Sequence, residues 1–190
     1  MKTRSFISLL SAITFVTMVT ACDPTPNREN TTETAEDQNE ETVSDDLEDE
    51  SEFLVEAASG GLYEVEMAKL AQQKAQSQAI KDLAARILED HTQANEKLNQ
   101  LAASKGISVP PAMGDEEQRK YDQFSEMEAE GFDEDYVEQM VQDHRDDIRD
   151  FEEAAEELDD PDVKTFASST LPALREHLSM AEQLEENVDM

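Results

Sequence analysis

The chain has 190 residues, of which 47 are acidic and 15 basic, and its formal net charge at pH 7 is −32. This acidity argues against nucleic acids and anionic lipid surfaces as partners. With only 5 glycines, 6 prolines and no run of β-branched residues, the composition favours an all-α protein.

The amino terminus has the pattern of an export signal. Lys2 and Arg4 precede an apolar run over residues 6–19, which is shorter than the roughly 20 residues that a membrane-spanning helix needs. The run ends at Val19-Thr20-Ala21-Cys22, which resembles a bacterial lipobox, so we expect residues 1–21 to be removed and Cys22 to be lipidated. Ordinary secretion, with Cys22 left unmodified, is the alternative. The lipid would anchor the protein in the bacterial cell envelope, on the outer membrane or facing the periplasm.

Residues 22–52 form a strongly acidic segment after the cysteine. Positions 23–52 hold 13 acids, one base (Arg28) and no aromatic residue. Such a segment buries too little apolar surface to offset its ordering entropy, so we predict a disordered tether. Loss of Lys2 and Arg4 with the signal leaves 13 bases against 47 acids, a formal charge of −34.

Residues 53–190 are long enough for one domain with its own core, and their first half predicts a helical hairpin. Apolar residues recur every three or four positions from about Glu52 to Gln76, and again from Ser77 until Lys105-Gly106 stops the pattern. Only about two residues separate the two stripes, so the helices should be antiparallel neighbours.

The second half predicts another hairpin after a long connection. Residues 105–131 contain Val109-Pro110-Pro111 and a short candidate helix from Glu116 to Glu128. A third long helix is expected over residues 133–158, and Asp159-Asp160-Pro161 should end it and cap a fourth that runs to about residue 188. Two antiparallel hairpins joined by a long connection predict a ferritin-like four-helix bundle.

The three histidines of the chain lie on the apolar stripes of three different helices. In antiparallel hairpins, residues equally far from the turn lie at the same depth. The first turn places His91 one step from Glu64, and the second places His144 and His177 within about two residues of each other. All four positions are near mid-helix, so we expect Glu64, His91, His144 and His177 to converge.

Three imidazoles and a carboxylate are sufficient for one Zn, Cu, Fe or Mn ion. Methionines one helical turn away, Met67, Met140 and Met180, favour copper because thioethers are soft ligands, and zinc fits the same imidazole set. Asp90 and Asp143 directly precede two of the histidines and could orient neighbouring rings. The alternative is a structural polar layer, with the methionines as core fillers and the histidines satisfied by groups such as Glu64.

Other chemistry has little support. Ferritin-type diiron oxidases use Glu-x-x-His on two helices, but Leu88, Val141 and Leu174 stand three residues before the histidines, which disfavours a diiron centre. The sequence also has no phosphate loop, nucleophile elbow or Cys-x-x-Cys pair, so it points away from an enzyme, and no catalytic residue is assigned.

Several separate motifs, in order, carry a resemblance to a known family. They lie at residues 53–58, 60–66, 90–95, 131–136, 143–144, 160–162 and 171–177. The chain resembles the bacterial exported family catalogued as domain of unknown function 4142. The resemblance implies a ferritin-like bundle with no established activity, and it gives Glu64 and the three histidines no metal role.

Two functional hypotheses follow. The first is an envelope lipoprotein that binds a transition metal, Cu or Zn in preference, at mid-bundle. The second is a non-catalytic structural or interaction module with an envelope protein partner, in which the histidines only join the helices.

Overall fold

The computed structural model describes residues 30–188, which form six α-helices, one short 3-10 helix and no strand. The elements in order are α1 (Thr31–Thr42), η1 (Asp45–Leu47), α2 (Glu48–Lys74), α3 (Gln78–Lys105), α4 (Asp115–Glu126), α5 (Ala129–Glu157) and α6 (Pro161–Val188). None of these helices is both long enough and apolar enough to span a bilayer.

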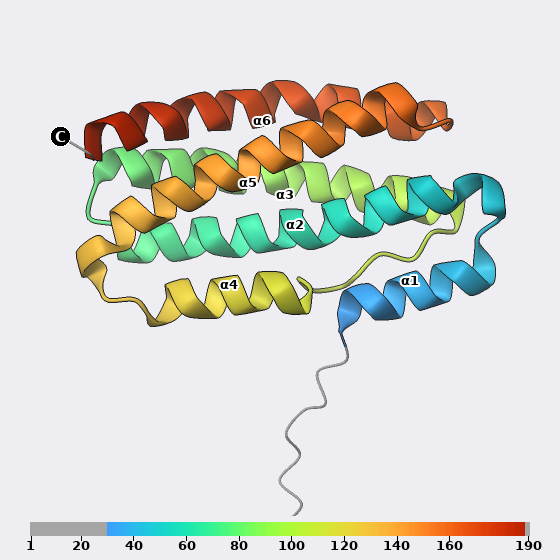
Figure 1. Cartoon of the computed structure of the whole chain (residues 1–190), viewed down its shortest axis with the longest axis horizontal. Coiled ribbons are helices and arrows are strands. Elements are labelled where there is room, and N and C mark those ends of the chain that lie inside the picture. Colours follow the sequence, from blue (N-terminus) through green and yellow to red (C-terminus); the bar gives the residue numbers. More distant parts are fainter. Residues whose placement is uncertain (1–29, 189–190) are drawn as a thin grey trace, which may run out of the picture.

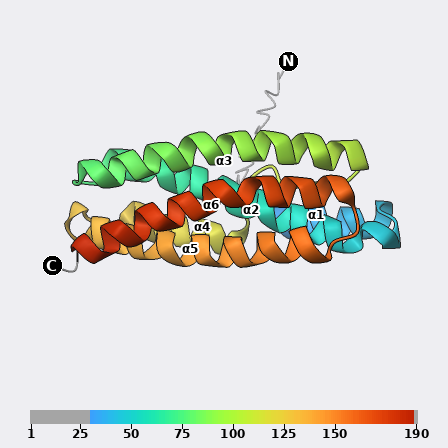
Figure 2. The same ribbon diagram turned by 90° about the horizontal axis from the view of Figure 1, so that it is seen from above.

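Four long helices make the bundle. The largest contacts lie within the two hairpins, α2 with α3 and α5 with α6, while α3 also packs on α6 and α2 on α5 (Figures 1 and 2). The shorter helices α1 and α4 both lie along α2, outside the four-helix core (Figure 1). The predicted all-α bundle with a short helix in its long connection is therefore confirmed, whereas its ferritin-like assignment stays a prediction.

The tether prediction, which ran to residue 52, is wrong from residue 31 onward. Residues 31–42 form α1 and residues 45–47 form η1, both of which pack against α2, and residues 48–52 begin α2 itself. Asn39 is 4% exposed, and its side-chain amide donates to the carbonyl of Ser108 while its Oδ1 accepts from the Ser108 N–H. Composition underestimated this segment because much of its order comes from hydrogen bonds to a distant backbone, while its own buried apolar surface is limited to small side chains such as Ala35. The predicted signal over residues 1–21, Cys22 and the tether as far as residue 29 lie outside the described residues.

The ends of the long helices differ slightly from the predicted bounds. α2 begins at Glu48, four residues early, and the three acids of its first turn suit the positive end of a helix. At the start of α5, Gly131 has φ 85°, a conformation that glycine tolerates best, so regular helix starts close to the predicted residue 133.

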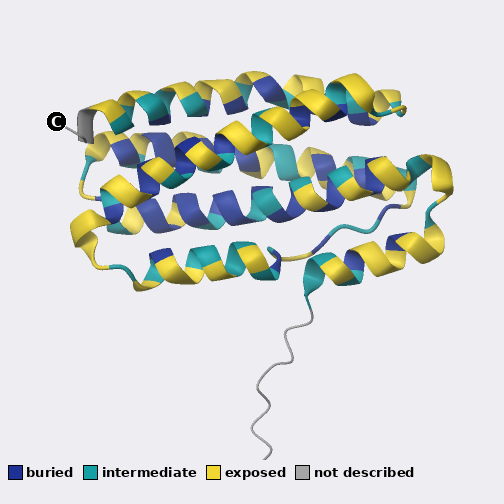
Figure 3. Ribbon diagram, in the orientation of Figure 1, coloured by how far each residue is buried: buried dark blue, intermediate teal, exposed yellow. Residues whose placement is uncertain are grey.

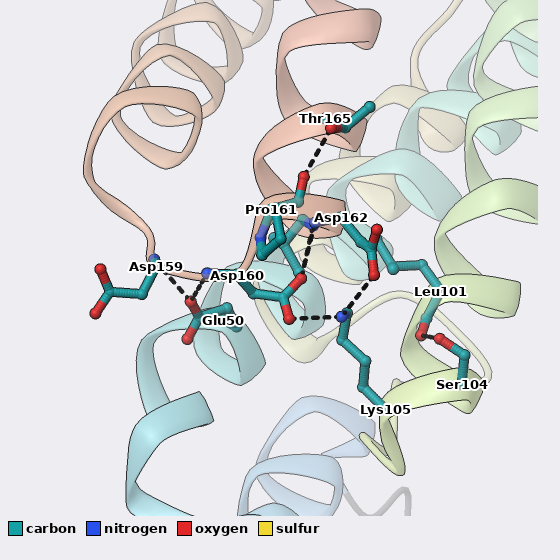
Figure 4. Close-up of polar contacts among 10 residues, drawn as sticks. Glu50, Leu101, Ser104, Lys105, Asp159, Asp160, Pro161, Asp162 and Thr165 are labelled. Carbon is teal, nitrogen blue, oxygen red and sulfur yellow. Dashed lines mark hydrogen bonds and ion pairs between the residues drawn. The ribbon is translucent and has the colours of Figure 1, made fainter.

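Each hairpin turn is fixed by an acid from the other hairpin. Asp133 of α5 accepts from the backbone N–H groups of Gln76 and Ser77 at the α2–α3 turn. Glu50 of α2 accepts from the N–H groups of Asp159 and Asp160 at the α5–α6 turn (Figure 4). Ser77 makes no side-chain cap of its own. These contacts fix the two hairpins relative to each other at both ends of the bundle.

Asp160 is the predicted cap of α6. Its Oδ1 accepts from the N–H groups of Asp162 and Val163, and its Oδ2 accepts from Lys105 at 2.6 Å (Figure 4). This carboxylate therefore satisfies two of the free donors at the helix start, as expected for an N-cap residue.

Buried residues line the facing sides of the helices (Figure 3) and separate into two apolar clusters. One cluster surrounds Phe132 and Tyr136 near the α2–α3 turn, and the other surrounds Leu98 and Phe166 near the α5–α6 turn. On α3, α5 and α6 the histidines fall between the two clusters in sequence. The core is thus two apolar halves separated by a polar layer.

Candidate metal centre

Each of the four bundle helices contributes one side chain to the polar layer. Glu64 comes from α2, His91 from α3, His144 from α5 and His177 from α6, and none of them is more than 6% exposed. One nitrogen from each imidazole lies within 4.8 Å of one nitrogen of each of the others. Depth matching thus correctly predicted which residues come together.

Every ring has one nitrogen held by an acceptor outside the histidine cluster. His91 Nδ1 lies 2.8 Å from Glu64 Oε2, and His177 Nε2 lies 2.9 Å from Asp90 Oδ2. His144 Nδ1 donates to the carbonyl oxygen of Met140, one turn earlier in α5, at 2.9 Å. Since a carbonyl can only accept, this contact fixes the His144 tautomer when the ring is neutral.

The remaining nitrogens carry the lone pairs that a metal would use. His144 Nε2 lies 3.2 Å from His177 Nδ1, and His91 Nε2 is buried without a hydrogen-bond partner. If both rings of the His144–His177 pair are neutral and donate outward, two lone pairs face each other across that 3.2 Å. The contact then needs a cation between the rings, either an extra proton or a metal ion.

Burial disfavours the extra proton. Desolvation lowers the pKa of all three imidazoles, and it holds the pKa of His144 well below its ordinary value, with the neighbouring rings of His91 and His177 adding to the effect. These shifts favour the neutral rings, which are the form that binds metals.

Carboxyl groups surround one side of the layer. Burial, and then the charge of Asp143, raises the pKa of Glu64 well above its usual range. Burial and Glu64 do the same to Asp147, and burial raises the pKa of Asp143 to about 6. Glu64 Oε1 also lies 3.5 Å from His144 Nδ1, so the carboxyl of Glu64 faces two imidazoles.

Of the side chains that were expected beside the histidines, only some contact an imidazole ring. Asp90 contacts His177 as expected for an orienting group, whereas Asp143 accepts from Gln139 instead of from a ring. Met67 and Met140 lie in the apolar cluster on the α2–α3 side, and Met180 packs against it. The methionines therefore all lie on one side of the histidines, packed among apolar side chains.

Sequence reasoning missed four groups at the layer. The Met140 carbonyl has no side-chain signal, although its spacing of four residues from His144 is visible. Asp147, three residues after His144, could have been found by the same helical spacing. Tyr63 and Tyr136 have buried hydroxyls without a hydrogen-bond partner, and both lie near Glu64 and Asp143.

Comparison with known proteins gives a family and a fold. A crystal structure of a DUF305 fragment from Deinococcus radiodurans is similar to this chain, with a TM-score of 0.64 and 13% sequence identity. The likeness covers 73% of this chain and 96% of that one. At this identity the similarity shows the fold alone. No curated protein matches the sequence significantly.

The family model described as domain of unknown function (DUF4142) matches residues 32–184. This range includes all of α1 except its first residue, a segment that the composition had assigned to a tether, and all four side chains of the polar layer. The chain therefore belongs to the DUF4142 family.

Proposed function

We propose that the protein binds one transition-metal ion between His144 Nε2, His177 Nδ1 and His91 Nε2. The observation that supports this proposal is the orientation of the rings: each holds one nitrogen on an outside acceptor, His144 and His177 turn their other nitrogens toward each other, and His91 Nε2 is buried without a partner. Metal-binding histidines donate their second N–H to a carboxylate or a carbonyl in this way.

The spacing of two of the rings agrees with this role. Two nitrogens at 2.0–2.1 Å from a tetrahedral metal lie about 3.3–3.4 Å apart. His144 and His177 are already 3.2 Å apart, whereas His91, which stacks on His177 and has a nitrogen within 4.8 Å of the other two, has to turn inward to complete the set. Glu64 and Asp90 then act as orienting groups, so Glu64 stabilises the site without being a ligand.

Three imidazoles with a fourth position left open favour zinc or copper over iron and manganese, which more often take carboxylate ligands as well. We further propose that the domain is held on the cell envelope by a lipid on Cys22, which the lipobox-like sequence supports. The change Cys22→Ser should release the protein from washed membranes, and unchanged sedimentation with membranes would contradict the anchor.

Metal analysis and thermal unfolding test the metal proposal. The purified protein should take up close to one Zn²⁺ or Cu⁺ per chain. At a free metal concentration about 100 times Kd, binding adds about 2.7 kcal/mol of stability. That raises Tm by roughly 5–11 °C in a domain of this size. An unchanged Tm with both metals, together with no bound metal after gel filtration, would refute the proposal.

One observation favours a purely structural layer as the second candidate. Met140, His144, His177 and Asp90 form a continuous hydrogen-bonded chain that one additional proton would satisfy completely. In that case one of the two rings carries a positive charge at neutral pH. Nitrogen-15 chemical shifts of the metal-free protein distinguish the candidates, because an imidazolium and a neutral ring give different patterns.

A further inference from the structure

A cleft of about 450 Å³ opens beside the polar layer, between α2, the start of α4 and the middle of α5, with α1 at its edge. Ten of its lining residues are acidic, and two, Lys120 and Arg149, are basic. Glu64, Asp143 and Asp147 line it next to the histidines, and we call these three residues the cleft floor.

The two basic residues form their ion pairs with exposed carboxylates at the edge of the cleft, which we call the rim. Arg149 pairs with Asp146 at 2.6 Å and with Asp150 at 3.0 Å, and Lys120 lies 3.6 Å from Glu116. All of these carboxylates are more exposed than those of the cleft floor. Among the ion pairs of the described residues, the floor carboxylates meet no lysine or arginine.

Buried polar atoms without partners point to a ligand in this cleft. Tyr63 lines it, is only 3% exposed, and has a hydroxyl with no hydrogen-bond partner. Asp143 Oδ2 is likewise buried and unpartnered. Such groups lower the stability of a fold unless something satisfies them, and a ligand that carries both positive charge and water satisfies all of them.

We propose that the cleft floor binds a hydrated divalent cation of the hard class, such as Mn²⁺ or Mg²⁺, at a site separate from the three imidazoles. Hard cations take carboxylate oxygens and commonly keep several waters, so the floor carboxylates need not all touch the ion. The Tyr63 hydroxyl would bind a cation-bound water. Glu64 lies at both sites, since its Oε2 holds His91 and its side chain lines the cleft.

Paired variants of α5 provide the test, with Mn²⁺ as the probe and its electron paramagnetic resonance signal as the measure of the free ion. Asp143→Asn with Asp147→Asn alters the floor, and Asp146→Asn with Asp150→Asn alters the rim. Both pairs replace two carboxyl groups of the same helix with amides. In about 0.15 M salt, which screens exposed charges, we expect the floor pair to weaken Mn²⁺ binding at least tenfold and the rim pair less than twofold.

Equal losses in the two pairs, or no saturable Mn²⁺ binding by the unaltered protein, would overturn the proposal. A second measurement needs no variant, because substoichiometric Mn²⁺ should broaden the ring resonances of Tyr63 before those of other aromatic residues, and unselective broadening counts against the site. The outcome is independent of the histidine site, because Zn²⁺ uptake by the floor pair tests that site separately. Retained Zn²⁺ uptake with lost Mn²⁺ binding identifies two sites.

Discussion

The hydrogen bond between Asp90 and His177 provides a direct test of how the histidine site is built. Asp90 Oδ2 accepts from His177 Nε2 at 2.9 Å and also lies 3.0 Å from Arg86 Nε. The change Asp90→Ala leaves the His177 ring without its acceptor. Loss of such a partner weakens metal binding by about 10–100-fold, which is roughly 1.4–2.7 kcal/mol. Because the Asp90 side chain is 22% exposed and water can replace it in part, we expect a value near tenfold.

Competition against a chromophoric zinc chelator measures this loss. The matched control is Glu89→Ala, which removes the same charge from the adjacent, exposed position of α3. The control should change the Zn²⁺ affinity less than twofold, and Asp90→Asn, which keeps a neutral acceptor, should lie between the two. If Glu89→Ala and Asp90→Ala weaken binding equally, the effect of Asp90 is general electrostatics and the reasoning about ring orientation fails.

Three further predictions concern stability. The change Asp160→Ala should lower the free energy of unfolding, measured in urea, by about 1 kcal/mol because α6 loses its cap. The control Asp159→Ala alters an exposed side chain at the same turn and should lower it little. Equal losses in the two variants would contradict the capping role. Burial holds the pKa of His144 well below its ordinary value, so as pH falls below about 6.5 the unfolded chain gains a proton before the folded one does. The free energy of unfolding of the metal-free protein, relative to that of its His144→Leu variant, should then decrease as the pH falls from about 7.5 to 5.5. A difference that stays flat or increases towards acid would show that the ring is charged in the folded protein. Asn39→Ala should lower the free energy of unfolding by about 1–3 kcal/mol and speed amide hydrogen exchange in α1. Gln38→Ala, at an exposed neighbouring position, should change neither the stability nor the exchange rate. Slow exchange in both variants would mean that the Asn39 contacts do not hold α1.

Local patterns in the sequence were sufficient for the helices of the bundle. The predicted bounds of the four long helices lie within a few residues of the observed ones, because apolar periodicity, Gly106 and Asp159-Asp160-Pro161 act through neighbouring backbone atoms. Counting residues from each turn also correctly predicted that His91 lies next to Glu64 and His144 next to His177, because a short turn fixes the depth of every residue in an antiparallel hairpin.

Contacts between distant segments were not predictable in this way. The order of α1 depends on Asn39 meeting the backbone of Ser108, and the α2–α3 turn is held by Asp133, 56 residues after Ser77. Neither Ser108 nor Asp133 can be recognised as a partner from the composition of the segment that it contacts. The tether prediction was wrong for α1 for this reason.

The sequence by itself determined the helices, their pairing into hairpins and the residues of the polar layer. Only the tertiary structure decided the role of each atom in that layer. It placed Glu64 and Asp90 on the outer nitrogens, turned His144 Nε2 toward His177 Nδ1 and, among the described residues, gave the floor carboxylates no ion pair with a lysine or arginine. The physical reason is that periodicity fixes the face and depth of a side chain, whereas the rotation of a ring and the choice of its hydrogen-bond partner depend on which helices lie around it.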